Sequence, residues 1–163
     1  MGAAGITLVI VREDLIGYAH PLTPLIFDYK LQADDNSMLS TPPTYNWYLL
    51  GLVLEWLKEQ GGISAIEARN SRKADKLYAA IDASSFYSNP VDPSVRSRMN
   101  VPFLLANTDL EKIFLAQAKE HGLVNLEGHR SVGGLRASLY NAMPEEGVDA
   151  LVTFMQDFER KQG

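Results

Sequence analysis

The chain has 163 residues, of which 46% are hydrophobic and 21% are charged, a composition typical of a folded domain with a packed core. Its formal net charge of −5 argues against a nucleic-acid partner held by a bulk positive field. The absence of cysteine excludes disulfides, thiolate catalysis and cysteine-ligated zinc. The histidines lack metal-ligand spacing, so we expect no metal site.

Neither a membrane span nor a signal peptide is expected. No apolar stretch reaches the roughly 18–20 residues that a helix needs to cross a bilayer. The apolar segment "GITLVIV" (5–11) is short, rich in β-branched residues and followed at once by charged ones, unlike a signal peptide. We therefore predict a cytoplasmic protein with neither a membrane nor a nucleic-acid partner.

The first predicted element is a strand over residues 6–11, "ITLVIV". Its apolar run does not alternate, which is typical of a strand buried on both faces of a mostly parallel sheet. Residues 12–40 are expected to be mostly connection and offer no comparable strand. The sheet neighbours of this strand are therefore expected to come from upstream.

A helix is predicted from the stretch "STPPTYNWYLLGLVLEWLKEQGG" (40–62). Ser40 or Thr41 can cap it, with two prolines in the first turn, and the glycine pair 61–62 ends it. Residues 45–54 carry no charge, which is typical of a helix that is buried or packs against another subunit. The cap has a second interpretation, an anion site in which the hydroxyls of Ser40 and Thr41 lie beside free N–H groups.

A second helix is predicted over residues 63–82, leading from one domain into the next. Its inward side chains are expected to be Ile66, Leu77, Tyr78 and Ile81. Its middle, "EARNSRKADK" (67–76), is expected to face solvent.

The remainder of the chain predicts a small α/β layer, with helices packed on a short sheet. Strands are expected over residues 97–105, 123–126 and 135–140. A helix over 108–122 is expected to end at Gly122, and Thr108 and Glu111 form its predicted capping box. The closing helix, 144–162, is expected to turn inward Val148, Leu151, Val152, Met155 and Phe158.

The strand 135–140 carries a cation on its alternating outer face. Arg136 shares that face with Ser138 and Tyr140, so it is either a solvent-exposed residue or a guanidinium fork that binds a carboxylate. The glycine pair 133–134 before the strand favours close approach of a ligand.

His129 and Arg130, in the loop before these glycines, also have two interpretations. They are ordinary surface residues, or they hold a second anionic group. Together with Arg136 they suit a doubly anionic small molecule, because each charge-assisted hydrogen bond contributes roughly 1.5–3 kcal/mol.

Four stretches carry a family resemblance, in this order: "GITLVIVREDLIG", "SMLSTPPTYNWYLLGLVLEWLK", "SRMNVPF" and "GHRSVGGLRASLYNAM". Together they resemble the phosphoserine aminotransferase family, class V pyridoxal-phosphate enzymes of the fold type I aminotransferases. The resemblance covers nearly the whole chain but only the back half of the family's chain. It implies an α/β fold: the end of the large PLP-transferase domain (1–60, with an interface helix), a linking helix (61–85) and the small C-terminal α/β domain (86–163).

The resemblance also implies roles for the candidate residues. Arg136 matches the arginine that binds the substrate α-carboxylate. His129 and Arg130 match the pair near the distal phosphate or carboxylate of the substrate. Thr41 and Ser40 match the pair that reaches across a homodimer to the phosphate of pyridoxal 5′-phosphate. The family usually has asparagine where Ser40 stands, so a shorter reach is expected there.

The family's reaction transfers an amino group from glutamate to 3-phosphohydroxypyruvate, giving 2-oxoglutarate and O-phosphoserine in serine biosynthesis. Its Schiff-base lysine precedes a turn that "GAAG" (2–5) resembles, which places that lysine upstream of this chain. We therefore expect no catalytic residue within the chain, which is predicted to be inactive alone. The alternatives are a non-catalytic module that dimerises or binds phosphorylated acids, and an aminotransferase of the same fold with another acid substrate.

Overall fold

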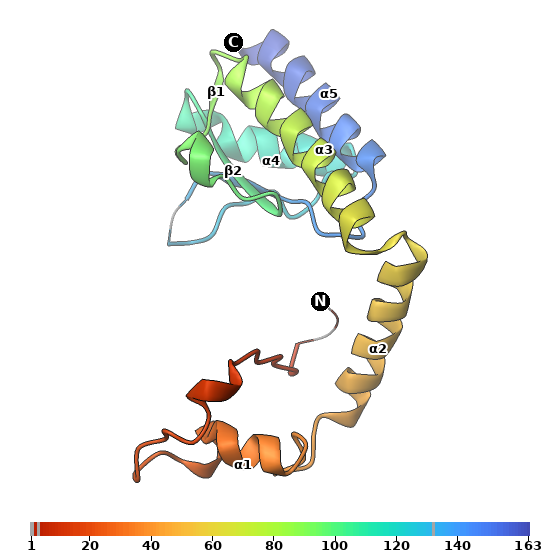
Figure 1. Cartoon of the computed structure of the whole chain (residues 1–163). Helices are drawn as coiled ribbons and strands as arrows, with labels where there is room; N and C mark the ends of the chain where they lie inside the picture. The colour runs from red at the N-terminus through yellow and green to blue at the C-terminus, as the bar shows by residue number, and fades with distance from the viewer. Residues whose placement is uncertain (1, 3, 132) are drawn as a thin grey trace. The chain divides into compact units, whose positions relative to one another are not determined.

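The computed structural model describes residues 2, 4–131 and 133–163 (Figure 1). Two compact units divide the chain, Met1–Gln60 and Gly61–Gly163. Met1 and Ala3, at the "GAAG" turn expected from the resemblance, lie outside the described residues. The same holds for Val132 in the loop before the arginine-bearing strand.

The first unit consists of helices and extended chain, and no described residue in it is buried. Its elements are η1 (Glu13–Leu15), η2 (Leu25–Phe27), α1 (Tyr29–Asp34) and α2 (Thr44–Glu59). The predicted buried strand over residues 6–11 is wrong, since Leu8 and Ile10 are 76% and 91% exposed. A strand exists only where a neighbouring strand pairs with its backbone, and no described segment of this unit supplies one.

Helix α2 is confirmed, but it begins after its predicted caps. Thr44 is the first helical residue, and Pro43 takes the N-cap position without a side-chain hydrogen bond. A proline disfavours the helical conformation in the residue before it, so the two prolines keep Thr41 out of the helix. The predicted cap by Ser40 or Thr41 is therefore wrong.

The second unit is built on a three-stranded antiparallel sheet with strand order β1-β2-β3. Its elements are α3 (Gly62–Asp82), β1 (Tyr87–Ser88), η3 (Pro93–Val95), β2 (Asn100–Leu105), η4 (Thr108–Leu110), α4 (Glu111–Glu120), β3 (Leu135–Ser138) and α5 (Glu145–Gln162). The predicted strand over 123–126 is wrong. Beside β3, this part of the chain forms an isolated bridge between Glu127 and Leu135, and the Arg136 N–H donates to the Leu126 carbonyl. These contacts do not extend into a ladder.

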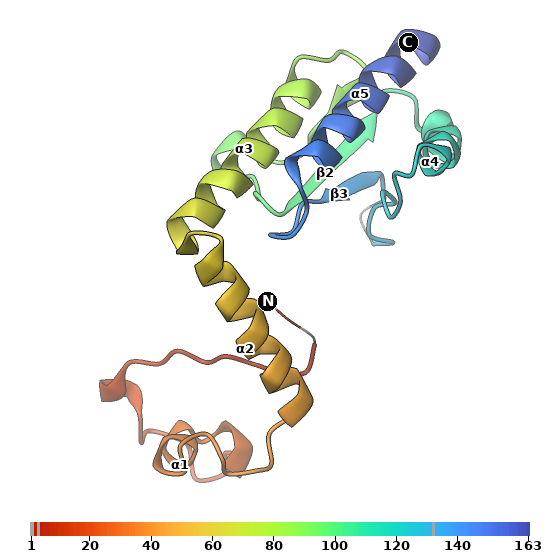
Figure 2. The ribbon, with the colours of Figure 1, turned by 90° about the vertical axis from the view of Figure 1, so that its right-hand side faces the viewer.

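Helices and sheet form two layers around one core. Helices α3 and α5 lie side by side over the sheet (Figures 1 and 2). Strands β2 and β3 alternate between buried and half-buried residues, and the buried ones are Val101, Phe103, Leu105, Leu135 and Ala137. On α5, Val152 packs against the core while the other predicted inward residues are buried: Val148, Leu151, Met155 and Phe158. This confirms the α/β class and leaves the other face of β3 outside the core.

The buried face of α3 is wider than predicted. Its predicted inward residues are buried: Ile66, Leu77, Tyr78 and Ile81. However, Asn70 and Lys73, in the segment expected to face solvent, are only 6% and 1% exposed. Their spacing from Ile66 and Leu77 places them on the same helical face. The predicted solvent-facing middle is wrong at these two positions and at Ala74, which is 1% exposed. The Asn70 amide nitrogen and the Lys73 ammonium donate to protein acceptors, while the Asn70 side-chain oxygen has no partner among the described residues.

Helix α4 starts differently from its prediction. Asn107 caps the preceding 3-10 turn, with its side-chain oxygen accepting from the Asp109 N–H at 3.0 Å. The predicted capping box of Thr108 and Glu111 is therefore wrong, because a side chain one residue earlier takes the capping role. The predicted stop at Gly122 is confirmed by its left-handed backbone, with φ +77°.

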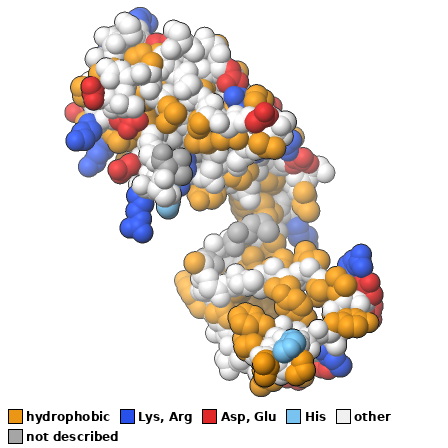
Figure 3. All heavy atoms as spheres, turned by 90° about the vertical axis from the view of Figure 1, so that its left-hand side faces the viewer, with side chains coloured by type: hydrophobic (Ala, Val, Ile, Leu, Met, Phe, Trp, Pro, Cys, Tyr) orange, Lys and Arg blue, Asp and Glu red, His pale blue; other side chains and the backbone are white. Residues whose placement is uncertain are grey.

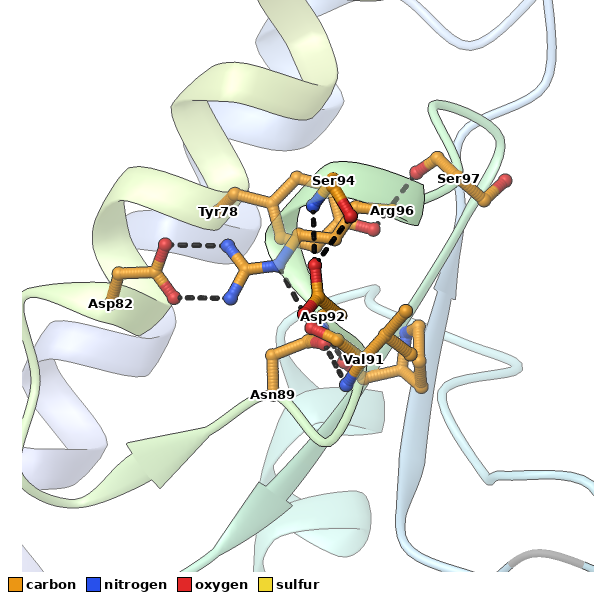
Figure 4. Close-up of polar contacts among 9 residues, drawn as sticks. Tyr78, Asp82, Asn89, Val91, Asp92, Ser94, Arg96 and Ser97 are labelled. Carbon is orange, nitrogen blue, oxygen red and sulfur yellow. Dashed lines mark hydrogen bonds and ion pairs between the residues drawn. The ribbon is translucent and has the colours of Figure 1, made fainter.

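An arginine clamp, made of Tyr78, Asp82 and Arg96, holds the chain that enters β2 against α3 (Figure 4). Arg96 donates to both carboxylate oxygens of Asp82, at 2.5 and 2.9 Å. Its guanidinium lies 4.7 Å from the centre of the Tyr78 ring. The Tyr78 hydroxyl donates to the Ser97 carbonyl at 2.8 Å. Because a bidentate pair fixes both distance and orientation, the clamp sets the approach of the chain entering β2 to α3.

The arginine clamp predicts a loss of stability in acid. The hydrogen bond from Arg96 lowers the pKa of the Asp82 carboxyl below its ordinary value of 3.8. The ion pair therefore stabilises the fold above pH 3.8, and its contribution is lost as the pH falls through the lowered pKa. Asp82→Asn is expected to lower Tm at pH 7 by no more than about 4 °C, because the pair is partly exposed. Thermal melts should show this difference shrinking in acid, and a pH-independent difference would contradict the assignment.

Candidate anion-binding site

Five arginines of the chain have a carboxylate partner, whereas two others form no ion pair with a described residue. Ion pairs are made by Arg12, Arg72, Arg96, Arg98 and Arg160. By contrast, Arg130 and Arg136 make no ion pair with any described residue. An arginine without an acidic partner is available to an external anion, and both of these lie in the stretch that the sequence singled out.

Arg136 lies opposite Pro102 in the β2–β3 ladder and is half-buried. Its Nε is buried and has no hydrogen-bond partner among the described residues. A buried donor without an acceptor costs about 1–3 kcal/mol, which favours a ligand that supplies one. Arg136, Ser138 and Tyr140 point away from the core as predicted, and the Ser138 hydroxyl donates to Oδ1 of Asn100 at 3.2 Å.

The loop 128–134 leads into β3 and is closed by its own backbone. The Gly128 N–H donates to the Gly134 carbonyl, and the Gly133 N–H to the His129 carbonyl, both at 2.9 Å. A Cβ on Gly128 would collide with the Gly133 carbonyl, and a Cβ on Gly134, which has φ +64°, would collide with the Leu104 side chain. These glycines are therefore required by the tight return of the loop itself.

His129 and Arg130 are exposed on this loop. The His129 Nδ1 lies 2.6 Å from the Ser131 hydroxyl, which fixes the ring on that side. Figure 3 shows basic side chains and a histidine projecting side by side from the second unit. The bridge between Glu127 and Leu135 ties the loop to the start of β3, so the loop and Arg136 belong to one continuous hairpin.

Ser40 and Thr41 lie in the first unit, just before α2. Both are exposed, and their hydroxyls have no partner among the described residues. The start of α2 has no side-chain cap, so its first N–H groups are available as well. Two hydroxyls beside uncapped helix N–H groups have the donor chemistry that a phosphate requires.

Lys73 is a residue near the site that sequence reasoning missed. Its ammonium donates to backbone carbonyls just after β3, at Leu139, Tyr140 and Met143. The sequence signal for its burial was spacing alone. Lys73 lies seven residues after Ile66 and four before Leu77, and residues at these spacings share one face of a helix. A lysine in a polar run gives no indication of such partners.

Two further findings concern the kinds of site that the chain can hold. Within residues 2, 4–131 and 133–163, no group of three or more His, Cys, Asp or Glu side chains could hold a metal ion. In the same part of the chain, no helix has the length and apolarity needed to cross a membrane.

Comparison with known proteins assigns this chain to a class. The family model described as aminotransferase class-V matches residues 1–151. The chain therefore belongs to the class-V aminotransferase family.

Within that class, the similarity is to phosphoserine aminotransferases. The enzyme of Hahella chejuensis is 61% identical over 158 residues, which cover 97% of this chain and 44% of that protein. The enzyme of Pseudomonas aeruginosa (strain LESB58) is 57% identical over 163 residues, covering 100% of this chain and 45% of that protein. The chain thus spans less than half the length of these relatives.

Solved structures agree with the sequence comparison. Phosphoserine aminotransferase from Bacillus circulans subsp. alkalophilus matches with a TM-score of 0.87 and 45% identity, covering 94% of this chain and 43% of that one. A structure described as PLP-bound phosphoserine aminotransferase from Trichomonas vaginalis matches with a TM-score of 0.78 and 41% identity, covering 84% and 39%. The family resemblance and the fold expected from it are confirmed.

Proposed function

We propose that this chain supplies the substrate-anion site of a phosphoserine aminotransferase, an enzyme that transfers the amino group of glutamate to 3-phosphohydroxypyruvate. The observation that carries the proposal is Arg136, which has no carboxylate partner and a buried Nε without an acceptor among the described residues. A planar guanidinium of this kind binds a carboxylate through two parallel hydrogen bonds.

The chemistry of the substrates fits two separate anion-binding groups. Glutamate and O-phosphoserine share an α-carboxylate, and each carries a second anion at its far end. Arg136, held in the sheet, suits the constant carboxylate. His129 and Arg130, on the exposed loop, suit the far group, which changes from carboxylate to phosphate. One rigid group and one adaptable pair would therefore accept both substrates in turn.

Ser40 and Thr41 are the residues that we propose to hold the phosphate of pyridoxal 5′-phosphate. Their hydroxyls have no partner among the described residues and precede the uncapped start of α2, which fits a phosphate. When bound, this cofactor supplies the electron sink for amino transfer. Serine has a shorter reach than asparagine, so the hydrogen bond from Ser40 is expected to be weaker than the one made by the family's usual asparagine.

We propose that the protein acts as a cytoplasmic homodimer. Helix α2 supports this, because it exposes Tyr45 and Tyr48, at 70% and 64% of their surface. Figure 3 shows hydrophobic side chains gathered on the surface of this unit. Apolar surface of this extent is typical of an interface. Sedimentation of the full chain at 18.1 kDa, the mass of one copy, would contradict the dimer.

Titration of the full chain with O-phospho-L-serine tests the proposed function, with L-serine as the control that lacks only the phosphate. We expect the phosphorylated amino acid to bind more tightly, because His129 and Arg130 add a second point of attachment. Glutamate, 3-phosphohydroxypyruvate and pyridoxal phosphate are then added, and 2-oxoglutarate is measured. The chain is predicted to be inactive alone, so we expect binding without turnover, and formation of 2-oxoglutarate would contradict that prediction. Equal affinity for the two amino acids would overturn the assignment of the anion site.

A further inference from the structure

A lysine buried inside the second unit is the starting point. Lys73 is 1% exposed, and its Nζ donates to the carbonyls of Leu139, Tyr140 and Met143 at 3.2, 2.9 and 2.9 Å. Burial lowers the pKa of this amine below its ordinary value of 10.5. Only the protonated amine has three N–H groups for three acceptors, so the carbonyls favour the charged form and offset the cost of burying it.

All three acceptors belong to residues 139–143, which follow β3 and are called here the β3 exit. The Leu139 N–H donates to the Met99 carbonyl at 2.7 Å, so pairing beside β2 continues into the exit. The Met143 N–H donates to the Tyr140 carbonyl at 2.9 Å and closes a turn. The ammonium therefore binds the backbone where the chain leaves the sheet.

Asn70 holds the β3 exit at a second point. It lies one helical turn before Lys73, and its Nδ2 donates to the side-chain oxygen of Asn141 at 2.8 Å. An apolar side chain at position 73 would fill a similar volume but remove the ammonium from three carbonyls, of which only that of Tyr140 keeps another donor among the described residues, the Met143 N–H. Beyond packing, Lys73 therefore holds the backbone of the β3 exit in position.

We infer that Lys73, assisted by Asn70, is a positioning residue for Arg136. This inference rests on the function proposed above. Leu139 is the third residue after Arg136, which is about 10 Å along a strand. Strand β3 is only Leu135–Ser138, so the β3 exit is the anchor that keeps its end from fraying. A guanidinium fork must be held within about 0.5 Å and 10–20° of its productive geometry to bind a carboxylate through both hydrogen bonds.

The test uses the full chain with Lys73→Met, which keeps the length of the side chain and removes the ammonium. The Nε–H signal of Arg136 in a ¹H–¹⁵N spectrum reports the position of the guanidinium without any ligand. We expect this signal to shift, the amides of the β3 exit to exchange faster, and the affinity for O-phospho-L-serine to fall roughly tenfold. Lys112→Met, the same change on the exposed side of α4, is the matched control and should leave all three unchanged.

Chemical rescue separates the effect of the positive charge at position 73 from the effect of the side chain's length. The chain has no cysteine, so Lys73→Cys introduces a single thiol. Alkylation with 2-bromoethylamine restores an ammonium at the length of lysine, whereas 1-bromopropane gives a neutral side chain of the same length. We expect the aminoethyl form to recover the Arg136 signal and the affinity, and the propyl form to recover neither.

The outcomes decide the inference separately from the proposed function. If Lys73→Met lowers Tm but leaves the Arg136 signal and the affinity unchanged, Lys73 has a structural role alone and the inference is wrong. If Lys73→Met does not fold, Asn70→Ala takes its place, and an unchanged Arg136 signal there overturns the inference. If the signal responds as expected but the unaltered chain does not bind O-phospho-L-serine, the positioning stands and the proposed function fails.

Discussion

Replacing Arg136 by alanine is expected to weaken the binding of O-phospho-L-serine by roughly 10- to 150-fold, because a charge-assisted hydrogen bond contributes about 1.5–3 kcal/mol. The guanidinium has no acidic partner among the described residues, so its loss breaks no internal ion pair. The residue also points away from the core, so the variant should keep its fold. Isothermal titration calorimetry of the two chains measures the ratio of affinities.

Two further variants separate recognition of the carboxylate from recognition of the phosphate. Arg136→Lys keeps the charge but loses the planar fork, so its affinity should fall between those of the unaltered chain and Arg136→Ala. Arg130→Ala should weaken the binding of O-phospho-L-serine while leaving L-serine, which has no phosphate, unaffected. Equal affinity of Arg136→Ala and the unaltered chain for both amino acids would exclude Arg136 from the site.

The elements that the sequence predicted well depend on residues close together in the chain. Alternation over 135–140 placed Arg136 on the outer face of β3, and the structure confirms it. The helical spacing of the apolar residues likewise predicted the inner face of α5. Such patterns indicate which face of a helix or strand packs against the core. This inference does not require knowing which other element packs there. The roles of His129, Arg130 and Arg136 came from the family resemblance and stay predictions.

The predictions that proved wrong depend on partner segments, which the spacing of residues in the sequence does not reveal. Residues 6–11 have the composition of a buried strand, yet a strand requires a neighbour, and none is described in the first unit. Residues 123–126 fail for a related reason, because the adjoining chain meets β3 at an isolated bridge. Lys73 is the opposite case, since a charged residue in a polar run is normally solvated and only the three carbonyls justify its burial.

The largest effect on stability is expected from Phe114→Ala, at about 3–5 kcal/mol of unfolding free energy. Phe114 is fully buried, and its ring lies 5.0 Å, between centroids, from the rings of both Phe154 and Phe158 on α5. On its other side it meets Tyr87 and Phe103 of the sheet, at 6.2 and 6.0 Å. Truncating this ring removes contacts to both layers at once and leaves a cavity that neither can fill alone.

Two optical signals allow the effect to be assigned to one unit. Trp47 and Trp56, the two tryptophans of the chain, both lie in the first unit, so their fluorescence reports that unit. Circular dichroism also detects α3 and α5 of the second. In urea, Phe114→Ala should lower the midpoint of the dichroism transition, whereas the tryptophan emission of the two folded chains, measured without urea, should be the same. Phe27→Ala, at a residue 66% exposed in the first unit, is the matched control and should change stability by no more than about 0.5 kcal/mol. An unchanged dichroism midpoint for Phe114→Ala would mean that packing between the sheet and the helices does not depend on this ring. Phe114 would then not be a central residue of the core.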